Sequence, residues 1–275
     1  MKRLLSVFAL LLLFASPLRA ASVDGLTIHS TSAGAGPATI IFVHGWTCDL
    51  SSWAAQLPEF SKKYRVIALD LPGHGASDVP KDGKFSMTLF ARAVEAVRAE
   101  AGADKIVLVG HSMGAPVILQ YALLYPTHAA GIVAADGPLD MRQFARALNG
   151  QKLPSLSGPE GLKARETMIR GMFTPRTPPA LQQQILAMML RTSEVTATGA
   201  MASIFAPDIR PDATTAVPAL EILAGTGQAV NVDEARKSLP KFEQTQVNGT
   251  GHFVMMENPA EFNRRLADFL NRIRF

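Results

Sequence analysis

The sequence predicts an α/β domain in which a mostly parallel β-sheet is covered by helices on both faces. Short apolar runs alternate with longer helical patterns along the chain. Most of these runs are too apolar for a sheet with one face in water, and such runs are typical of parallel strands buried on both sides. The interval 139–217 is far too long for a crossover between two strands, so we expect a helical insertion there.

The composition agrees with this class. The chain has 275 residues, which is long enough to bury a sizeable core, and it is 48% hydrophobic and 18% charged. These values exclude a disordered chain, a collagen-like fibre, a coiled coil and a multi-span membrane protein. Because Cys48 is the single cysteine, neither an intramolecular disulfide nor a cysteine-based zinc cluster can form.

Residues 1–20 have the layout of a secretory signal peptide. Lys2 and Arg3 precede the apolar run 4–14, and Ser16, Pro17 and the small residues 20–22 follow. The apolar run is shorter than the roughly 20 residues that a membrane-spanning helix needs. We therefore expect cleavage after Ala20 and a periplasmic or secreted protein without stable membrane insertion. An uncleaved N-terminal anchor is the alternative.

The formal net charge of +4 comes partly from this segment. Removing residues 1–20 deletes Lys2, Arg3 and Arg19 and no acidic residue, so that 24 of the 27 basic residues remain against 23 acidic ones, a net charge of +1. No basic stripe with interleaved aromatic residues is left, and we expect no nucleic-acid partner.

The elements follow in order from the apolar periodicity. The runs that predict strands are 26–31, 38–43, 65–69, 105–109, 131–135, 219–223 and 242–247. The helical patterns between them are 51–63, 86–101 with Ser86 as N-cap, 113–125, 233–239 and 259–273. Proline and glycine clusters separate four further helical patterns, 141–148, 160–172, 179–191 and 194–205. We expect a sheet domain of residues 21–138 and 217–275 with a helical cap of residues 139–216.

The strongest motif is Gly110-His111-Ser112-Met113-Gly114, which directly follows an apolar run and directly precedes a helical pattern. On a sharp strand-to-helix turn, the hydroxyl of Ser112 projects above the sheet, and the flanking glycines let backbone and helix approach closely. The N–H groups at the start of the following helix favour a developing negative charge. The motif in this context makes Ser112 a candidate nucleophile.

The motif at residues 110–114 and three other motifs resemble those of the α/β-hydrolase superfamily. The resemblance covers nearly the whole chain after residue 20. The other motifs are FVHGW (42–46), ALDLPGHGASD (68–78) and GTGHF (249–253). The resemblance implies that Ser112 is the nucleophile and His252 the general base. It also implies that the backbone N–H groups of Trp46 and Met113 form an oxyanion hole.

A base must reach Ser112 from a different loop, because a serine hydroxyl is a poor nucleophile until its proton is accepted. His252 suits this role because it lies in a glycine-rich turn after the last predicted strand. His44, His74 and His111 belong to the other motifs, where we expect structural or pocket-lining roles. For His29 and His128 we expect a solvated or hydrogen-bonded histidine.

The triad acid is where the sequence departs from its relatives. Most of them carry it a few residues beyond a glycine after the seventh strand, where this chain has Gln228. An amide can orient the imidazole but has no charge to stabilise imidazolium. Certain lipases and haloalkane dehalogenases place the acid one strand earlier, which points to Asp136. The alternatives are that Asp136 only stabilises the turn with Gly137 and Pro138, or that the acid is Asp233.

The sequence therefore predicts a serine hydrolase that needs no cofactor or metal and cleaves esters of small to medium apolar acids through an acyl-enzyme. Methionines in the cap form either an acyl pocket or a packing surface against the core. Lactone, thioester, amide or carbon–carbon bond hydrolysis with the same residues stays open. So does a catalytically weak ligand-binding protein, which Gln228 favours. Dehalogenase and epoxide hydrolase chemistry is disfavoured, because those relatives use a carboxylate where this chain has Ser112.

Overall fold

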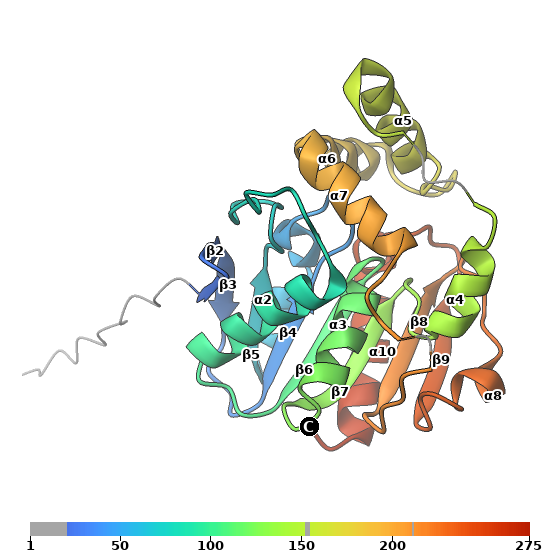
Figure 1. Cartoon of the computed structure of the whole chain (residues 1–275). Coiled ribbons are helices and arrows are strands. Elements are labelled where there is room, and N and C mark those ends of the chain that lie inside the picture. Colours follow the sequence, from blue (N-terminus) through green and yellow to red (C-terminus); the bar gives the residue numbers. More distant parts are fainter. Residues whose placement is uncertain (1–20, 152–154, 211) are drawn as a thin grey trace, which may run out of the picture.

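A computed structural model describes residues 21–151, 155–210 and 212–275 (Figure 1). The predicted signal peptide lies outside these residues. The strands are β1 (Ala21–Val23), β2 (Leu26–Ile28), β3 (Ser30–Ala33), β4 (Thr39–Val43), β5 (Arg65–Leu69), β6 (Ile106–His111), β7 (Ala129–Ala135), β8 (Ala219–Ala224) and β9 (Phe242–Val247). Seven of them form one sheet in the order β3-β5-β4-β6-β7-β8-β9, and only β3 is antiparallel to its neighbour. The predicted mostly parallel sheet is confirmed.

The strand prediction for residues 26–31 is wrong, because the chain changes sheets there. β2 pairs with β1 in a separate two-stranded sheet, whereas β3 pairs with β5. His29 lies between the two strands, and its backbone N–H donates to Ser77 Oγ instead of to a strand (2.8 Å). β1 was not among the predicted strands, since three residues are too few to show a period of two.

Helices cover both faces of the sheet. The core helices are α1 (Gln56–Phe60), α2 (Met87–Glu100), α3 (Gly114–Leu124), α8 (Val232–Ala235), α9 (Val254–Glu257) and α10 (Pro259–Arg272). Figure 1 shows α2 and α3 in front of the sheet and α10 behind it. The Ser86 side chain accepts a hydrogen bond from Leu89 N–H (3.0 Å), as its predicted N-cap role requires.

The single helix predicted over 51–63 is wrong. The segment forms a short 3-10 helix (Leu50–Trp53) and then α1. Pro58 has no N–H to donate to the carbonyl of Ala54, so one continuous helix would lack that hydrogen bond. The break lets Trp53 turn inward, where it is fully buried against Phe42 with ring centroids 5.0 Å apart.

The described residues between β7 and β8 form four helices: α4 (Met141–Leu148), α5 (Gly158–Arg170), α6 (Pro179–Leu190) and α7 (Glu194–Phe205). In Figure 1, α6 and α7 lie above the sheet edge at which β6 leads into α3. The exact division into a core and a cap of residues 139–216 stays a prediction, and we keep the word cap for that segment.

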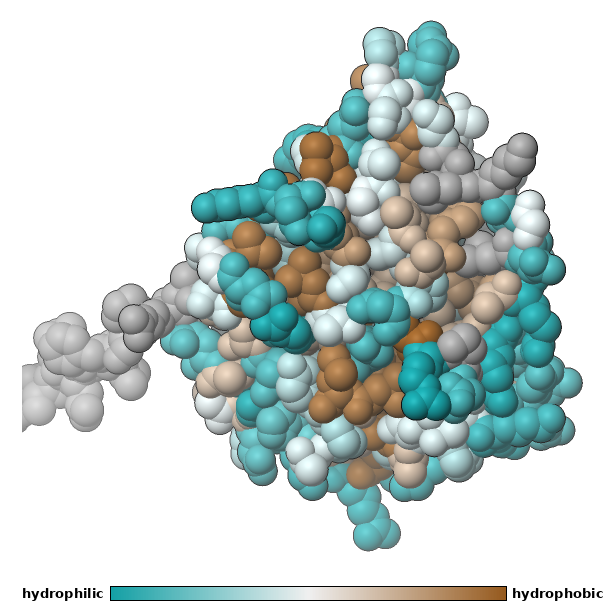
Figure 2. Space-filling model, in the orientation of Figure 1, coloured by the Kyte–Doolittle hydropathy of each residue, from teal (hydrophilic) through white to brown (hydrophobic). Residues whose placement is uncertain are grey.

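No helix in the described part of the chain is both long and apolar enough to cross a membrane. On the face in Figure 2, hydrophobic side chains lie in groups separated by hydrophilic ones.

Candidate active site

Ser112 occupies a strained turn between β6 and α3. Its φ of +50° is in the left-handed region, which non-glycine residues rarely adopt. The turn is held by hydrogen bonds from Ser112 N–H to Ala135 O (3.1 Å) and from Ala115 N–H to Ser112 O (2.9 Å). A Cβ on Gly110 would lie 2.3 Å from Gly114 O, so this position tolerates only glycine. The motif therefore forms the sharp strand–turn–helix geometry expected of a nucleophile turn.

His252 and Asp136 meet above the sheet although they are 116 residues apart in the chain. His252 Nδ1 lies 2.6 Å from Asp136 Oδ2, and the other carboxylate oxygen accepts the N–H of Ala224 (2.8 Å). The His252 side chain is 23% exposed and that of Asp136 is 10% exposed. A largely buried carboxylate thus holds Nδ1, and Nε2 is the nitrogen left to act on a hydroxyl.

The other candidates for the acid lie elsewhere. Asp233 is 94% exposed and lies 3.7 Å from Arg236, to which it pairs within its own helix turn. Gln228 is exposed and lines a cavity of about 330 Å³ that Asp136, Asp140 and Glu221 also line. The carboxylate oxygens of Asp136 contact β8 and the His252 loop rather than the turn at Gly137. Of the two acids considered, the structure brings only Asp136 to His252.

The turn that contains Gly45 and Trp46 packs against Ser112. A Cβ on Gly45 would lie 3.1 Å from Ser112 Cβ. The Trp46 ring is buried, and its Nε1–H donates to Ala197 O in α7 (2.8 Å), which joins this turn to the cap. Among the described residues, none accepts a hydrogen bond from the backbone N–H of Trp46 or Met113. The role of these two N–H groups as an oxyanion hole stays a prediction.

Three buried histidines support the loops around the site. Burial lowers the pKa of His44 and His111, and it lowers the pKa of His74 to about 3, so all three are neutral near pH 7. His44 Nδ1–H donates to Gly45 O (2.8 Å), and its Nε2 accepts the N–H of Leu71 (3.0 Å). His111 Nε2–H donates to the carbonyl oxygen of His252 (3.0 Å). These contacts fit the structural roles expected for the three histidines.

The two remaining histidines each lie beside a carboxylate other than Asp136, and the cysteine is buried. His29 Nδ1 lies 2.8 Å from Asp70 Oδ2, and His128 Nδ1 lies 3.3 Å from Glu95. Cys48 is buried, and burial raises the pKa of its thiol to about 12, so it is not a thiolate near neutral pH. Within the described ranges, no group of three or more His, Cys, Asp and Glu side chains could hold a metal ion.

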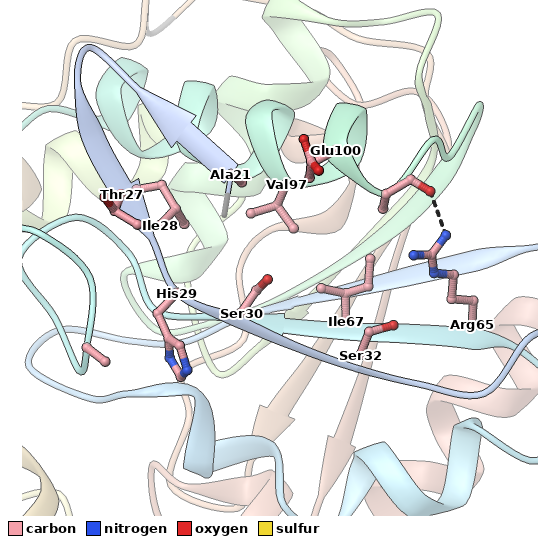
Figure 3. Close-up of a pocket in the computed structure, with 12 residues that line it drawn as sticks. Ala21, Thr27, Ile28, His29, Ser30, Ser32, Arg65, Ile67, Val97 and Glu100 are labelled. Carbon is pink, nitrogen blue, oxygen red and sulfur yellow. Dashed lines mark hydrogen bonds between the residues drawn. The ribbon is translucent and has the colours of Figure 1, made fainter. Parts of the chain in front are cut away.

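A separate cavity of about 310 Å³ lies beside β2 and β3, β5 and the end of α2 (Figure 3). Its polar lining includes His29, Arg65 and Glu100, and Arg65 Nη1 donates to Ala101 O (2.5 Å). Neither Ser112, His252 nor Asp136 lines it. The cavity therefore lies apart from the candidate active site.

Sequence reasoning missed two residues next to the site, Thr177 in the cap and Glu257 in α9. Thr177 Oγ1–H donates to Glu257 Oε2 (2.8 Å), and Gly251 N–H donates to the same oxygen (3.0 Å). Thr177 and Glu257 are 80 residues apart. No local pattern in one sequence signals such a contact.

Comparisons with known proteins find relatives of this sequence and of this fold. Residues 38–158 match the family model described as alpha/beta hydrolase fold. The chain is 29% identical over 250 residues to a dihydrolipoyllysine-residue acetyltransferase component of an acetoin cleaving system from Pseudomonas putida. That match covers 87% of this chain and 65% of the relative, so the chain spans less than two thirds of that protein. A putative esterase/lipase from Haemophilus influenzae is 23% identical, over 92% of this chain and 90% of that protein.

Solved structures with the same architecture include an enol-lactonase from Burkholderia xenovorans. It has a TM-score of 0.76 and 21% identity, over 92% of this chain and 100% of that one. A thermophilic esterase from Thermogutta terrifontis has a TM-score of 0.75 and 23% identity, over 93% of this chain and 97% of that one. At these identities the likeness establishes the fold.

Proposed function

We propose that this chain, which has the alpha/beta hydrolase fold, is a serine hydrolase that cleaves carboxylic esters of small to medium apolar acids. The observation that carries the proposal is the contact of His252 Nδ1 with Asp136 Oδ2 at 2.6 Å, at the sheet edge where Ser112 occupies its strained turn. A nucleophile, a base and an acid that orients the base are the three parts that acyl transfer by serine requires.

In the proposed mechanism, Ser112 Oγ attacks the ester carbonyl carbon and its proton passes to His252 Nε2. The negative charge of Asp136 stabilises the imidazolium, and the N–H groups of Trp46 and Met113 stabilise the oxyanion. His252 then gives the proton to the departing alcohol, which leaves an acyl-enzyme on Ser112. Water, activated by His252, attacks the acyl carbonyl and releases the acid.

The choice of an ester rests on two supports. The neighbours described as an esterase and an enol-lactonase both act, by their names, on an ester linkage, which is cyclic in a lactone. The chain also has Ser112 where epoxide hydrolases use a carboxylate, although mouse epoxide hydrolase 3 is 32% identical over 117 residues, or 42% of this chain. Lactone hydrolysis is the nearest alternative, because a lactone is a cyclic ester.

The cap methionines divide between packing and the proposed acyl pocket. Met188, Met189 and Met201 are buried, and Met188 Sδ lies 3.5 Å from Ser52 Oγ in the core, which supports a packing role for Met188. Met172 is only partly buried, and its carbonyl oxygen accepts the N–H of His252 (3.1 Å). We therefore assign the acyl side of the pocket to the cap segment around Met172.

The test is the initial rate of hydrolysis of p-nitrophenyl esters from acetate to palmitate by residues 21–275, with Ser112→Ala as the blank. We expect cleavage that requires Ser112 and a preferred chain length that reports the depth of the pocket. Labelling of Ser112 by a fluorophosphonate, lost in His252→Ala, tests the nucleophile without a substrate. An unreactive Ser112 would favour the ligand-binding alternative and contradict the proposal.

We also propose that the protein is exported and works in the periplasm or outside the cell. The charged start, the apolar run 4–14 and the small residues before Ala21 support this.

A further inference from the structure

The cap segment 172–177, between α5 and α6, lies directly against the loop that carries His252. Met172 O accepts the N–H of His252 (3.1 Å). A Cβ on Gly251 would lie 2.7 Å from that carbonyl oxygen, and one on Gly249 would lie 2.8 Å from Arg176 Nη1. Gly251 therefore allows the cap backbone to approach this closely, and Gly249 leaves room for the Arg176 side chain.

Glu257 links the same two segments through one oxygen atom. Its Oε2 accepts hydrogen bonds from Gly251 N–H (3.0 Å) and from Thr177 Oγ1–H (2.8 Å). Thr177 is buried, and its Oγ1 also accepts the N–H of Thr174 (2.9 Å), which orders the cap segment itself. Hydrogen bonds to a carboxylate are stronger than those between neutral groups. The residue before His252 is thus bound to the cap through a charge-assisted pair.

We propose that Thr177 and Glu257 are positioning residues that hold the His252 loop in its working place only while the cap segment 172–177 is docked. The inference rests on the proposed function, in which His252 is the general base. It means that the state of the cap is transmitted to the base as well as to the substrate pocket.

Two contacts of His252 do not depend on the hydrogen bonds that join Thr177 and Gly251 through Glu257. Asp136 holds Nδ1 (2.6 Å) and His111 holds the carbonyl oxygen (3.0 Å), and neither contact involves the cap. Loss of the cap link should therefore leave the imidazole near Asp136 but let the loop move relative to Ser112. A displacement on the order of 1 Å lowers the rate of reaction of a bound substrate without weakening binding to the same degree.

The test is Thr177→Val, which keeps the shape of the side chain and removes its hydroxyl. We expect kcat to fall roughly tenfold with little change in KM, and Thr177→Ser to restore kcat. Glu257→Gln, which keeps the shape and removes the charge, should lower kcat in the same direction. The matched control is Ser203→Ala, which removes another buried hydroxyl of the cap, bonded to Ala200 O (2.7 Å) within α7. It should leave kcat unchanged.

A spectroscopic readout separates this inference from the proposed function. The low-field proton resonance of His252 Nδ1–H should broaden in Thr177→Val and stay sharp in Thr177→Ser and Ser203→Ala. A wild-type protein without turnover would overturn the proposed function, yet the resonance would still report the positioning. Unchanged kcat and an unchanged resonance in Thr177→Val, or an equal loss of kcat in Ser203→Ala, would overturn the inference.

Discussion

Backbone strain marks the candidate site at single residues. Among the described non-glycine residues, five have positive φ, and three of them are Ser112 (+50°), Asp136 (+46°) and Thr47 (+54°), next to Trp46. Each such residue costs on the order of 1–3 kcal/mol and persists only where the surroundings impose it. At Asp136 they do so through the hydrogen bond from its N–H to Ile222 O (2.9 Å). The strain is concentrated where Ser112 and Asp136 must project from the ends of strands.

Asp136→Asn should lower kcat by roughly four orders of magnitude, because a neutral amide neither stabilises imidazolium nor selects the correct tautomer of His252. Asp233→Asn is the control and should keep full activity, since Asp233 is 94% exposed. The rates of ester hydrolysis by the two variants decide whether Asp136 or Asp233 is the acid, and circular dichroism checks that both variants are folded. Near-normal turnover in Asp136→Asn together with its loss in Asp233→Asn would make Asp136 the wrong acid.

At the scale of elements, β8 places a carboxyl group where water scarcely reaches. All six of its residues are buried, and Glu221 is only 3% exposed. Gln244 Nε2–H in β9 donates a hydrogen bond to Glu221 Oε2 (2.5 Å). The pKa of Glu221 is raised from 4.5 to about 7. Burial is the largest cause, and the negative charges of Asp136 and Asp140 contribute to the same rise. Folding therefore takes up a proton at this strand.

Glu221→Gln should change how stability depends on pH. Between pH 4.5 and about 7 the folded protein keeps Glu221 protonated while the unfolded chain is ionised, so the free energy of unfolding falls as pH rises and levels off above pH 7. Glu221→Gln has no titrating group at this position, so its free energy of unfolding does not fall in this way. Relative to wild type, the free energy of unfolding of the variant should therefore rise by about 3 kcal/mol between pH 4.5 and about 7.

Urea unfolding at pH 4.5, 6 and 8 measures this difference. The matched control is Glu243→Gln in β9, whose side chain is 44% exposed and pairs with Arg272. It should show no such rise. Parallel stability curves for wild type and Glu221→Gln would contradict the raised pKa.

For the whole molecule, strand order brings the site together. Ser112 follows β6, Asp136 follows β7 and His252 follows β9, and the carboxyl ends of these parallel strands share one edge of the sheet. The cap helices follow β7 in the sequence and reach the same edge, where Trp46 and His252 bind Ala197 and Met172. The residues proposed as nucleophile, base and acid therefore all follow strands whose carboxyl ends lie at this edge of the sheet.

The proposed export leads to a prediction about the whole chain. The intact mass of the protein recovered from the periplasm or medium should correspond to a chain that begins at Ala21, because cleavage is expected after Ala20. A mass that still includes residues 1–20 would favour the N-terminal anchor instead.

Local patterns determined most of the architecture. The sequence predicts strands 65–69 and 242–247 with the bounds that β5 and β9 have, and it predicts the N-cap of α2 at Ser86. It does so because periodicity, capping and turn chemistry depend on neighbouring residues. The break at Pro58 and the change of sheet at His29 were missed because long-range packing overrides local periodicity there.

By itself, the sequence determined the α/β class, the order of the elements and Ser112 and His252 as candidates, because each depends on residues that are neighbours in the chain. Only the tertiary structure decided that Asp136 and not Asp233 reaches His252, 116 residues away, and that Thr177 binds Glu257 beside the same loop. Periodicity reports which face of an element is buried. Which distant side chains meet is set by strand order and by the packing of the cap on the sheet.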